Sequence, residues 1–550
     1  MKKHFLFSIA LFAGLISVKA QDDMPLVWES RMDHKIVHTG TGTEERGFSY
    51  AASDKEITVF DNKTGKPRWN KKFKELAPKL GKIDDLIPFW ESDVIFLFDR
   101  KLGKDVLAVV EMESGNFLWS TDKYQDVDEE NVVYIPEEQS FAISLKKELV
   151  FIRARTGEER WSTAKFKGVV GKYAITPDGY MVMVNFVPSS LGALFTGFKN
   201  QIAKIDIRNG DIIWENTYVG RAERKVISRE FLYDLFVDGD KVMLMNGYQV
   251  YDLKTGASLW SAAFDYTPDG IGKRPADAKK FGIYGAVADP VRVGDDLYVL
   301  DMSNRRSQYI KKYDANSGKL LWTSPEIKEA RAIPNMYIMG DKVVLQIGGN
   351  VEAQAYIYRR TRNSDGSVSV YEEWRIWYPN VKPNGVQAFN TSDGSLVWDS
   401  ERFRKGITNM IEAGSNVIVS SGKALYSMDI NTGKELYEVP VAKGGVGNAQ
   451  MIFPYKDMVA VIGEKGVSTF KMNNGDLVAN GKYKTSLLED RFDNIVIMKT
   501  EGADIAAFDL NTCKFLEFKA RKGATTSLTT DGEYVYVYEN KTVSKVRTGK

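Results

Sequence analysis

The chain has 550 residues, of which 43% are hydrophobic and 27% charged, so it is long enough to bury a large core. Its 75 basic and 73 acidic residues nearly balance, which excludes a global basic field for binding nucleic acid. The single cysteine, Cys513, excludes an internal disulfide and any paired-cysteine metal motif.

Residues 1–20 have the pattern of a secretory signal peptide. Lys2 and Lys3 form a basic start, residues 5–18 an apolar core, and residues 18–20 a small-residue cleavage site. The apolar run is short for a membrane span, and no cysteine follows the cleavage site to carry a lipid. We therefore expect a soluble mature protein, residues 21–550, in the periplasm or outside the cell. A membrane anchor at this end is the competing interpretation.

Two histidines, His34 and His38, follow the predicted cleavage site. On the strand suggested by HKIVH they would lie roughly 13 Å apart, too far to share a zinc ion. We expect both side chains at the surface.

A nine-residue pattern recurs ten times along the chain. The copies are DNKTGKPRW (61–69), EMESGNFLW (111–119), RARTGEERW (153–161), DIRNGDIIW (206–214), DLKTGASLW (252–260), DANSGKLLW (314–322), NTSDGSLVW (390–398), DINTGKELY (429–437), KMNNGDLVA (471–479) and DLNTCKFLE (509–517). Most intervals between their glycine positions lie between 38 and 53 residues, which matches one four-stranded propeller blade. Since no long stretch has strong helical periodicity, the sequence predicts an all-β chain.

The chemistry of the pattern is that of a hairpin turn. An acid or amide, a hydroxyl and a glycine suit a tight loop, because the polar side chains bond nearby backbone and glycine accepts positive φ. In DANSGKLLW the spacing excludes an EF-hand, since Gly318 is fifth and Pro325 stands where the twelfth-position glutamate would be. A large ring follows four residues after the glycine in eight copies: Trp69, Trp119, Trp161, Trp214, Trp260, Trp322, Trp398 and Tyr437. We expect these rings to dock on the neighbouring sheet, with Trp322 largely buried.

This pattern resembles the tryptophan-docking repeat of the PQQ-like β-propeller superfamily, which includes quinoprotein alcohol dehydrogenases and non-catalytic envelope scaffolds. The resemblance covers nearly the whole mature chain. It implies a β-propeller of four-stranded blades, and it leaves function open because this fold hosts both enzymes and scaffolds.

The two ends of the chain look complementary. Residues 24–30 supply one strand with Trp28 as the docking ring, and the C-terminal segment supplies strands that lack such a partner. We expect the ends to complete one blade together, which would hide two sheet edges. The count is then about 8–11 blade units, in one large ring or two smaller ones.

The resemblance to quinoprotein dehydrogenases raises an enzymatic alternative, in which PQQ and calcium are held in the propeller channel. Those enzymes typically carry a disulfide between adjacent cysteines, which one cysteine cannot form. No segment aligns with their calcium ligands or catalytic base, and no H-E-x-x-H, G-x-S-x-G or P-loop motif is present. Cys513 replaces a turn glycine and is not expected to act as a nucleophile. We expect no cofactor.

Residues 352–379 are the first candidate for partner binding, because they form an insertion that breaks the repeat. They suggest a long extra hairpin that turns at residues 363–366. Its candidate contact residues are Tyr356, Tyr358, Arg359, Arg360, Trp374, Arg375 and Trp377, of the types that anchor interfaces. The alternative is that the hairpin packs on its own propeller.

A second insertion, residues 187–200, places Leu191, Leu194, Phe195 and Phe198 on one face of a short helix. This face could contact a membrane or a partner, or it could cap the channel. Residues 267–282, rich in glycine and proline, are expected to be a solvated loop.

Together these features predict an exported, non-catalytic propeller that binds a protein or another component of the cell envelope. We expect a monomer with no transmembrane span, no nucleic-acid partner and, at most, peripheral contact with a membrane.

Overall fold

The computed structural model describes residues 22–101, 104–187, 198–220, 234–245, 247–264, 274–304, 306–362 and 368–550. Within these ranges helix is confined to α1 (Phe73–Leu76) and the short turns η1 (Trp90–Ser92), η2 (Glu129–Asn131), η3 (Pro136–Glu138) and η5 (Val441–Gly444). The prediction of an all-β chain is therefore confirmed. The predicted signal peptide lies outside the described residues. No helix in the described ranges is both long enough and apolar enough to cross a membrane.

Eleven sheets of four consecutive antiparallel strands, numbered here as blades, follow one another along the described chain. Blade 1 contains β3 (His38–Gly40), β4 (Phe48–Ala52), β5 (Glu56–Asp61) and β6 (Pro67–Lys72). Blade 2 contains β7 (Asp85–Phe89), β8 (Val94–Lys101), β9 (Lys104–Glu111) and β10 (Phe117–Thr121). Blade 3 contains β11 (Val132–Ile135), β12 (Ser140–Ser144), β13 (Leu149–Arg153) and β14 (Glu159–Thr163).

The middle of the chain forms blades 4 to 7. Blade 4 contains β15 (Val169–Ile175), β16 (Tyr180–Phe186), β17 (Ile202–Asp206) and β18 (Ile212–Asn216). Blade 5 contains β19 (Leu235–Asp238), β20 (Lys241–Leu244), β21 (Gln249–Asp252) and β22 (Ser258–Ser261). Blade 6 contains β24 (Val291–Val293), β25 (Asp296–Asn304), β26 (Ser307–Asp314) and β27 (Leu320–Thr323). Blade 7 contains β28 (Asn335–Met339), β29 (Lys342–Asn350), β32 (Asn380–Asn390) and β33 (Leu396–Asp399).

The last four blades use both ends of the chain. Blade 8 contains β34 (Ile407–Ala413), β35 (Asn416–Ser421), β36 (Ala424–Asp429) and β37 (Glu435–Pro440). Blade 9 contains β38 (Ala449–Tyr455), β39 (Met458–Gly463), β40 (Gly466–Lys471) and β41 (Leu477–Lys482). Blade 10 contains β42 (Ser486–Phe492), β43 (Ile495–Thr500), β44 (Ile505–Asp509) and β45 (Phe515–Phe518), and β1 (Asp22–Asp23) adds a parallel fifth strand. Blade 11 contains β46 (Thr525–Leu528), β47 (Tyr534–Glu539), β48 (Thr542–Arg547) and β2 (Leu26–Arg31).

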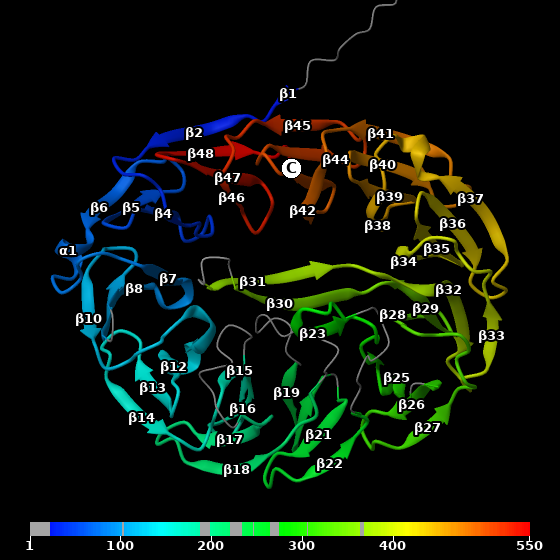
Figure 1. Cartoon of the computed structure of the whole chain (residues 1–550), viewed down its shortest axis with the longest axis horizontal. Helices are drawn as coiled ribbons and strands as arrows, with labels where there is room; N and C mark the ends of the chain where they lie inside the picture. The colour runs from blue at the N-terminus through cyan, green and yellow to red at the C-terminus, as the bar shows by residue number, and fades with distance from the viewer. Residues whose placement is uncertain are drawn as a thin grey trace, which may run out of the picture.

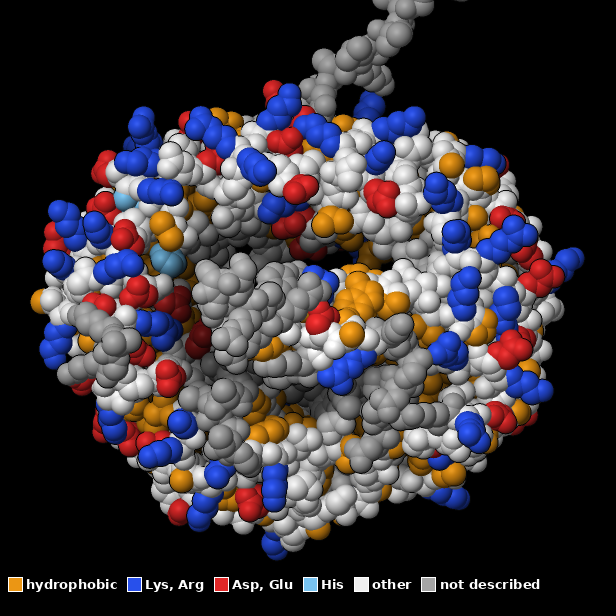
Figure 2. Space-filling view, in the orientation of Figure 1, with side chains coloured by type: hydrophobic (Ala, Val, Ile, Leu, Met, Phe, Trp, Pro, Cys, Tyr) orange, Lys and Arg blue, Asp and Glu red, His pale blue; other side chains and the backbone are white. Residues whose placement is uncertain are grey.

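The blades are arranged around a ring, with the first strand of each nearest the centre and the fourth at the circumference (Figure 1). The middle strands are apolar along their length, as in β16 and β43, because neighbouring blades cover both of their faces. The fourth strands alternate between exposed and buried residues. On the face of the ring shown in Figure 2, basic and acidic side chains are interspersed rather than segregated.

Docking rings connect nine of the eleven blades to the next. The ring of Trp398 in blade 7 lies against Gly433 of blade 8, and its Nε1 donates to the Ile430 carbonyl at 2.7 Å. The same contact with a repeat glycine is made by Trp28, Trp69, Trp119, Trp161, Trp214, Trp260, Trp322 and Tyr437. Trp322 is mostly buried, as expected, although it is more exposed than a ring such as Trp398, which is 7% exposed. Its ring still contacts Gly394, and its Nε1 bonds to the Thr391 carbonyl at 3.0 Å.

The strand pairing predicted for the two ends is present. In blade 11, β2 pairs antiparallel with β48, with Leu26 opposite Val546 and Arg31 opposite Thr542. Trp28 and Tyr536 of this blade then share one apolar cluster with Phe60 of blade 1.

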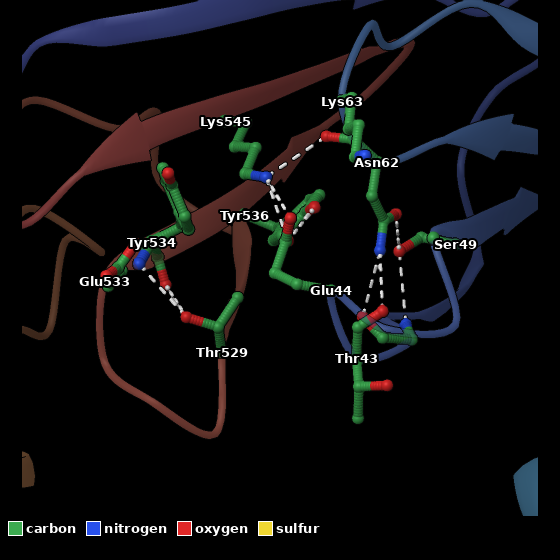
Figure 3. Close-up of polar contacts among 12 residues, drawn as sticks. Thr43, Glu44, Ser49, Asn62, Lys63, Thr529, Glu533, Tyr534, Tyr536 and Lys545 are labelled. Atoms are coloured by element: carbon green, nitrogen blue, oxygen red, sulfur yellow. Dashed lines mark hydrogen bonds and ion pairs between the residues drawn. The ribbon is translucent and has the colours of Figure 1, made fainter.

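A buried polar network lies at this seam between blades 11 and 1 (Figure 3). The Lys545 ammonium contacts both Glu44 carboxylate oxygens, at 2.8 and 2.9 Å, and lies 3.9 Å from the centre of the Tyr534 ring. It also donates to the Asn62 carbonyl, which accepts the Trp28 indole N–H. Only 3% of the Lys545 side chain is exposed, so water does little to stabilise its charge. The Glu44 carboxylate balances this charge within the seam.

Two expectations about local structure are wrong. His34 is buried rather than at the surface, and its Nε2 lies 3.0 Å from the Thr58 hydroxyl. Residues 278–282, expected in a solvated loop, belong to the strand β23 (Ala278–Tyr284). In both cases the partner is distant in the sequence, so no local pattern marks the contact.

Candidate functional site

An additional three-stranded sheet lies inside the ring (Figure 1). It has the order β23, β30 (Glu352–Arg362) and β31 (Val368–Trp377), and we call it the inner sheet. β30 and β31 pair antiparallel from Ala353 opposite Trp377 to Arg362 opposite Val368. The predicted pair of strands is therefore confirmed, and the predicted turn at residues 363–366 lies outside the described residues.

One side of the inner sheet is an apolar core. Ala353, Ala355 and Ile357 of β30 are fully buried, and the rings of Phe281 and Trp377 stack beside them at 6.0 Å. This packing on the propeller agrees with the alternative considered for the hairpin and accounts for Trp377. The apolar side of the inner sheet is thus held against the protein, and Gln354 on its other side is also buried.

The exposed part of the inner sheet includes the C-terminal end of β31. Arg375 is exposed, Ile376 is 50% exposed, and Tyr378, just beyond the strand, is 63% exposed. Tyr356 and Tyr358 are half-buried. The structure describes the strand positions of Arg359, Arg360 and Trp374 but not their side chains. Because successive strand residues point to opposite faces of a sheet, Arg375 lies on the same face as Ala355 and Trp377, and Ile376 lies on the other face.

The innermost strands of blades 8, 9 and 10 are joined by amide side chains. Asn409 of β34 bonds to both backbone groups of Ile452 in β38, at 2.7 and 2.9 Å. Gln450 of β38 donates to the Ser486 carbonyl of β42 at 2.8 Å and accepts from the Leu488 N–H. We call these three strands the inner wall.

The inner wall also exposes apolar side chains. Met451 on β38 is 40% exposed and Leu487 on β42 is 70% exposed. A dark slot opens inside the ring beside the C-terminal blades (Figure 2). The sequence did not single out Met451, Leu487 or Tyr378, because an isolated apolar residue near a turn carries no distinctive pattern.

Both insertions belong to the same face of the ring. In a four-stranded meander, the loops between strands two and three lie on the same face as the connections between blades. Residues 187–201 connect β16 to β17, and residues 351–379 connect β29 to β32, both in this position. The repeat turns with their glycines lie on the opposite face. We call the first face the insertion face.

The second insertion is described only at its end. Leu191, Leu194 and Phe195 lie outside the described residues. Phe198 is half-buried and packs on its own blade, since a Cβ added to Gly168 would lie 2.8 Å from its ring. The described contact of Phe198 is therefore with another part of the same protein.

Comparison with known proteins assigns the chain to a family. A family model described as outer membrane protein assembly factor BamB matches residues 3–186 and 382–518, more than half of the chain. The chain belongs to this BamB family. The resemblance inferred from the docking repeat is confirmed. Both insertions and the inner sheet lie between the two segments that match the BamB model.

Three solved structures are similar to the chain at low sequence identity. BamB from Moraxella catarrhalis is 14% identical over 81% of this chain and 98% of its own, with a TM-score of 0.28. The computationally designed Ika8 protein is 14% identical over 71% and 100%, with a TM-score of 0.33. A eukaryotic initiation factor is 12% identical over 75% and 94%, with a TM-score of 0.31. No curated protein sequence matches this BamB-family chain.

Chemically reactive groups are sparse in the described part of this BamB-family protein. No three His, Cys, Asp or Glu side chains there are grouped in a way that could hold a metal ion. Cys513 is buried, and burial raises the pKa of its thiol to about 11, so the nucleophilic thiolate is disfavoured near neutral pH.

Proposed function

We propose that this protein is an exported, non-catalytic propeller scaffold of the cell envelope, which binds a protein partner on its insertion face. The observation that carries the proposal is the inner sheet, whose last strand exposes Ile376 and is followed by the exposed Tyr378 within the ring. Exposed apolar and aromatic groups are typical of the centre of protein interfaces. Membership of the BamB family supports a role in interaction with envelope proteins.

The partner would enter between the inner sheet and the inner wall. Met451 and Leu487 give the wall apolar contacts, and Arg491 of the same wall lies 4.1 Å from the centre of the Phe453 ring. The blades hold these groups on strands, so little conformational entropy is lost when a partner binds. Binding by a rigid frame accords with a scaffold role.

Affinity capture with matched variants tests the proposal. The wild-type protein, an Ile376→Asp/Tyr378→Asp variant and a Leu259→Asp/Leu436→Asp control would be used to capture proteins from an envelope extract. Leu259 and Leu436 are similarly exposed, at 49% and 47%, but lie on fourth strands at the circumference. A protein retained by the wild type and the control but lost with the inner-sheet variant would then be purified and titrated. Equal retention by all three would overturn the proposed site.

Export and the absence of cofactor chemistry have separate tests. Fractionation should place the protein in the periplasm or the medium, with a mature N-terminus at Gln21. Addition of PQQ and calcium to the purified protein should produce neither quinone absorbance of a bound cofactor nor dye-linked alcohol oxidation. Either signal would favour the dehydrogenase alternative. Light scattering should give the mass of a monomer.

A further inference from the structure

A basic hollow of about 480 Å³ opens on the insertion face, at the end of blade 4. Three lysines line it: Lys165 and Lys167 come from the connection between β14 and β15, and Lys199 from the insertion that precedes β17. The end of β18 contributes Glu215 and Thr217. Segments from two consecutive blades therefore bring their cations to one place.

The backbone around the hollow is fixed by two amide side chains. Buried Asn185 donates to the carbonyls of both Lys167 and Lys199, at 2.5 and 2.9 Å, and accepts from the Gln201 N–H at 2.7 Å. Gln201 in turn donates to the Lys165 carbonyl at 3.1 Å. The segments that carry the three lysines are thus held together before any ligand arrives.

Among the described residues, no carboxylate forms an ion pair with the three ammonium groups. The only carboxylate lining the hollow among the described residues is Glu215, and it accepts the Gln201 amide at 2.6 Å. Three cations against one anion leave a local charge near +2 in a chain whose formal net charge is only +2.

We propose that this hollow binds a phosphate-bearing ligand that carries at least two negative charges. Lysine ammonium groups are point charges with three donors each, suited to several phosphate oxygens at once. The Thr217 hydroxyl, which also lines the hollow, adds a neutral donor. The ligand is either a soluble phosphate compound or the headgroup of an anionic envelope lipid, and both present the same chemistry to the lysines. This inference does not depend on the partner site in the ring interior.

Direct titration tests the proposal with pyrophosphate as the soluble probe and phosphatidylcholine vesicles, with or without phosphatidylglycerol, as the membrane probe. The Lys165→Gln/Lys167→Gln/Lys199→Gln variant should lose affinity by about a hundredfold, since each lysine near a phosphate surface contributes about 1 kcal/mol. Binding to the wild type should weaken as salt is added, because the lysines are exposed.

A matched control separates this site from general charge. Lys319→Gln/Lys434→Gln/Lys514→Gln removes the same number of exposed lysines from the repeat turns on the opposite face and should bind like the wild type. Pyrophosphate binding without vesicle binding identifies a soluble ligand, and selective binding to phosphatidylglycerol vesicles identifies a headgroup. The proposal is overturned if the wild type binds neither probe, or if both triple variants lose affinity equally. Thermal melting checks that both variants are folded.

Discussion

The Trp398 ring occupies the space in which a side chain of Gly433 would lie. A Cβ on Gly433 would be 2.6 Å from the ring, and the glycine has a φ of +69°. Two independent requirements therefore meet at this position. The turn needs a left-handed residue, and the docking ring needs a residue without a side chain.

Substitution of Gly433 by alanine should consequently cost more than the conformational strain alone. Gly239 is the control, since its φ is +58° and no atom lies within 4 Å of an added Cβ. We expect Gly239→Ala to destabilise by about 1–2 kcal/mol, and Gly433→Ala by roughly 2 kcal/mol more because the ring must move. Denaturant unfolding midpoints, with hydrogen exchange at β33 and β37, would measure both effects. Equal losses would mean that the ring adjusts freely.

One of the two copies of the repeat without a docking ring shows the same relationship in reverse. Ala479 stands where other copies have tryptophan, and the corresponding glycine of the next blade is replaced by Cys513, with a φ of +52°. Both residues belong to the apolar contact between blades 9 and 10. Removal of the ring has therefore made room for a side chain on the turn, which gives Cys513 a packing role.

Cys513 should be unreactive in the folded protein. Burial raises the pKa of the thiol to about 11, and a nearby Thr469 hydroxyl lies 3.8 Å from its sulfur. A thiol reagent at pH 8 should modify the protein only after denaturant is added. Rapid modification of the native protein would show that the turn opens.

The raised pKa of the Cys513 thiol makes the free energy of unfolding depend on pH in the alkaline range. The folded state holds the neutral thiol, so its stabilisation is complete below the unfolded pKa of about 8.5 and is lost as pH rises through the folded value of about 11. Relative to Cys513→Ser, which does not titrate there, the wild type should lose roughly 2–3 kcal/mol of unfolding free energy across this interval. If the difference in unfolding free energy between the two proteins stayed constant as pH rises, the raised pKa of Cys513 would be contradicted.

The free energy of unfolding should fall more when Glu44 of the seam ion pair is replaced than when Lys545 is replaced. Glu44→Gln would leave the ammonium of Lys545 buried without its counter-charge, at a cost of about 3 kcal/mol. Lys545→Met keeps a similar volume, leaves Glu44 partly solvated and should cost less than half as much. Denaturant unfolding and hydrogen exchange of β2 and β48 would compare the variants. A larger loss for Lys545→Met would show that its bond to the Asn62 carbonyl dominates.

The repeat made much of the fold predictable from sequence. Each copy combines a turn with a ring, and both requirements act over a few residues, so the turn role of Gly394 and the docking role of Trp322 follow from the local pattern alone. The eleven blades lie at the upper end of the predicted range. The two intervals wider than 53 residues, from Gly256 to Gly318 and from Gly318 to Gly394, mark where the inner sheet interrupts the regular pattern.

Only the hairpin of the inner sheet was predictable from the sequence, because the third strand pairs with it over a long distance along the chain. The pairing of β30 with β31 follows from a local turn, but β23 joins from more than seventy residues away. Likewise, His34 is buried because it meets Thr58 of another strand. The lysines of the basic hollow are separated by up to 34 positions and are brought together by Asn185, which no motif marks.

Loss of the Trp377 ring should unfold the inner sheet locally without unfolding the propeller. The ring stacks on Phe281 at 6.0 Å and an interplanar angle of 28°, in a cluster separate from the apolar contacts between blades. Because Trp377 is half-buried, we expect Trp377→Ala to cost about 2–3 kcal/mol, less than a fully buried ring. Hydrogen exchange should accelerate in β23, β30 and β31 and remain unchanged in strands such as β16 and β43. Tyr378→Ala, one residue further and mostly exposed, should leave exchange in the inner sheet unchanged. Faster exchange throughout the blades of the Trp377 variant would show instead that the inner sheet is a structural support of the ring, and the case for it as a docking surface would fall.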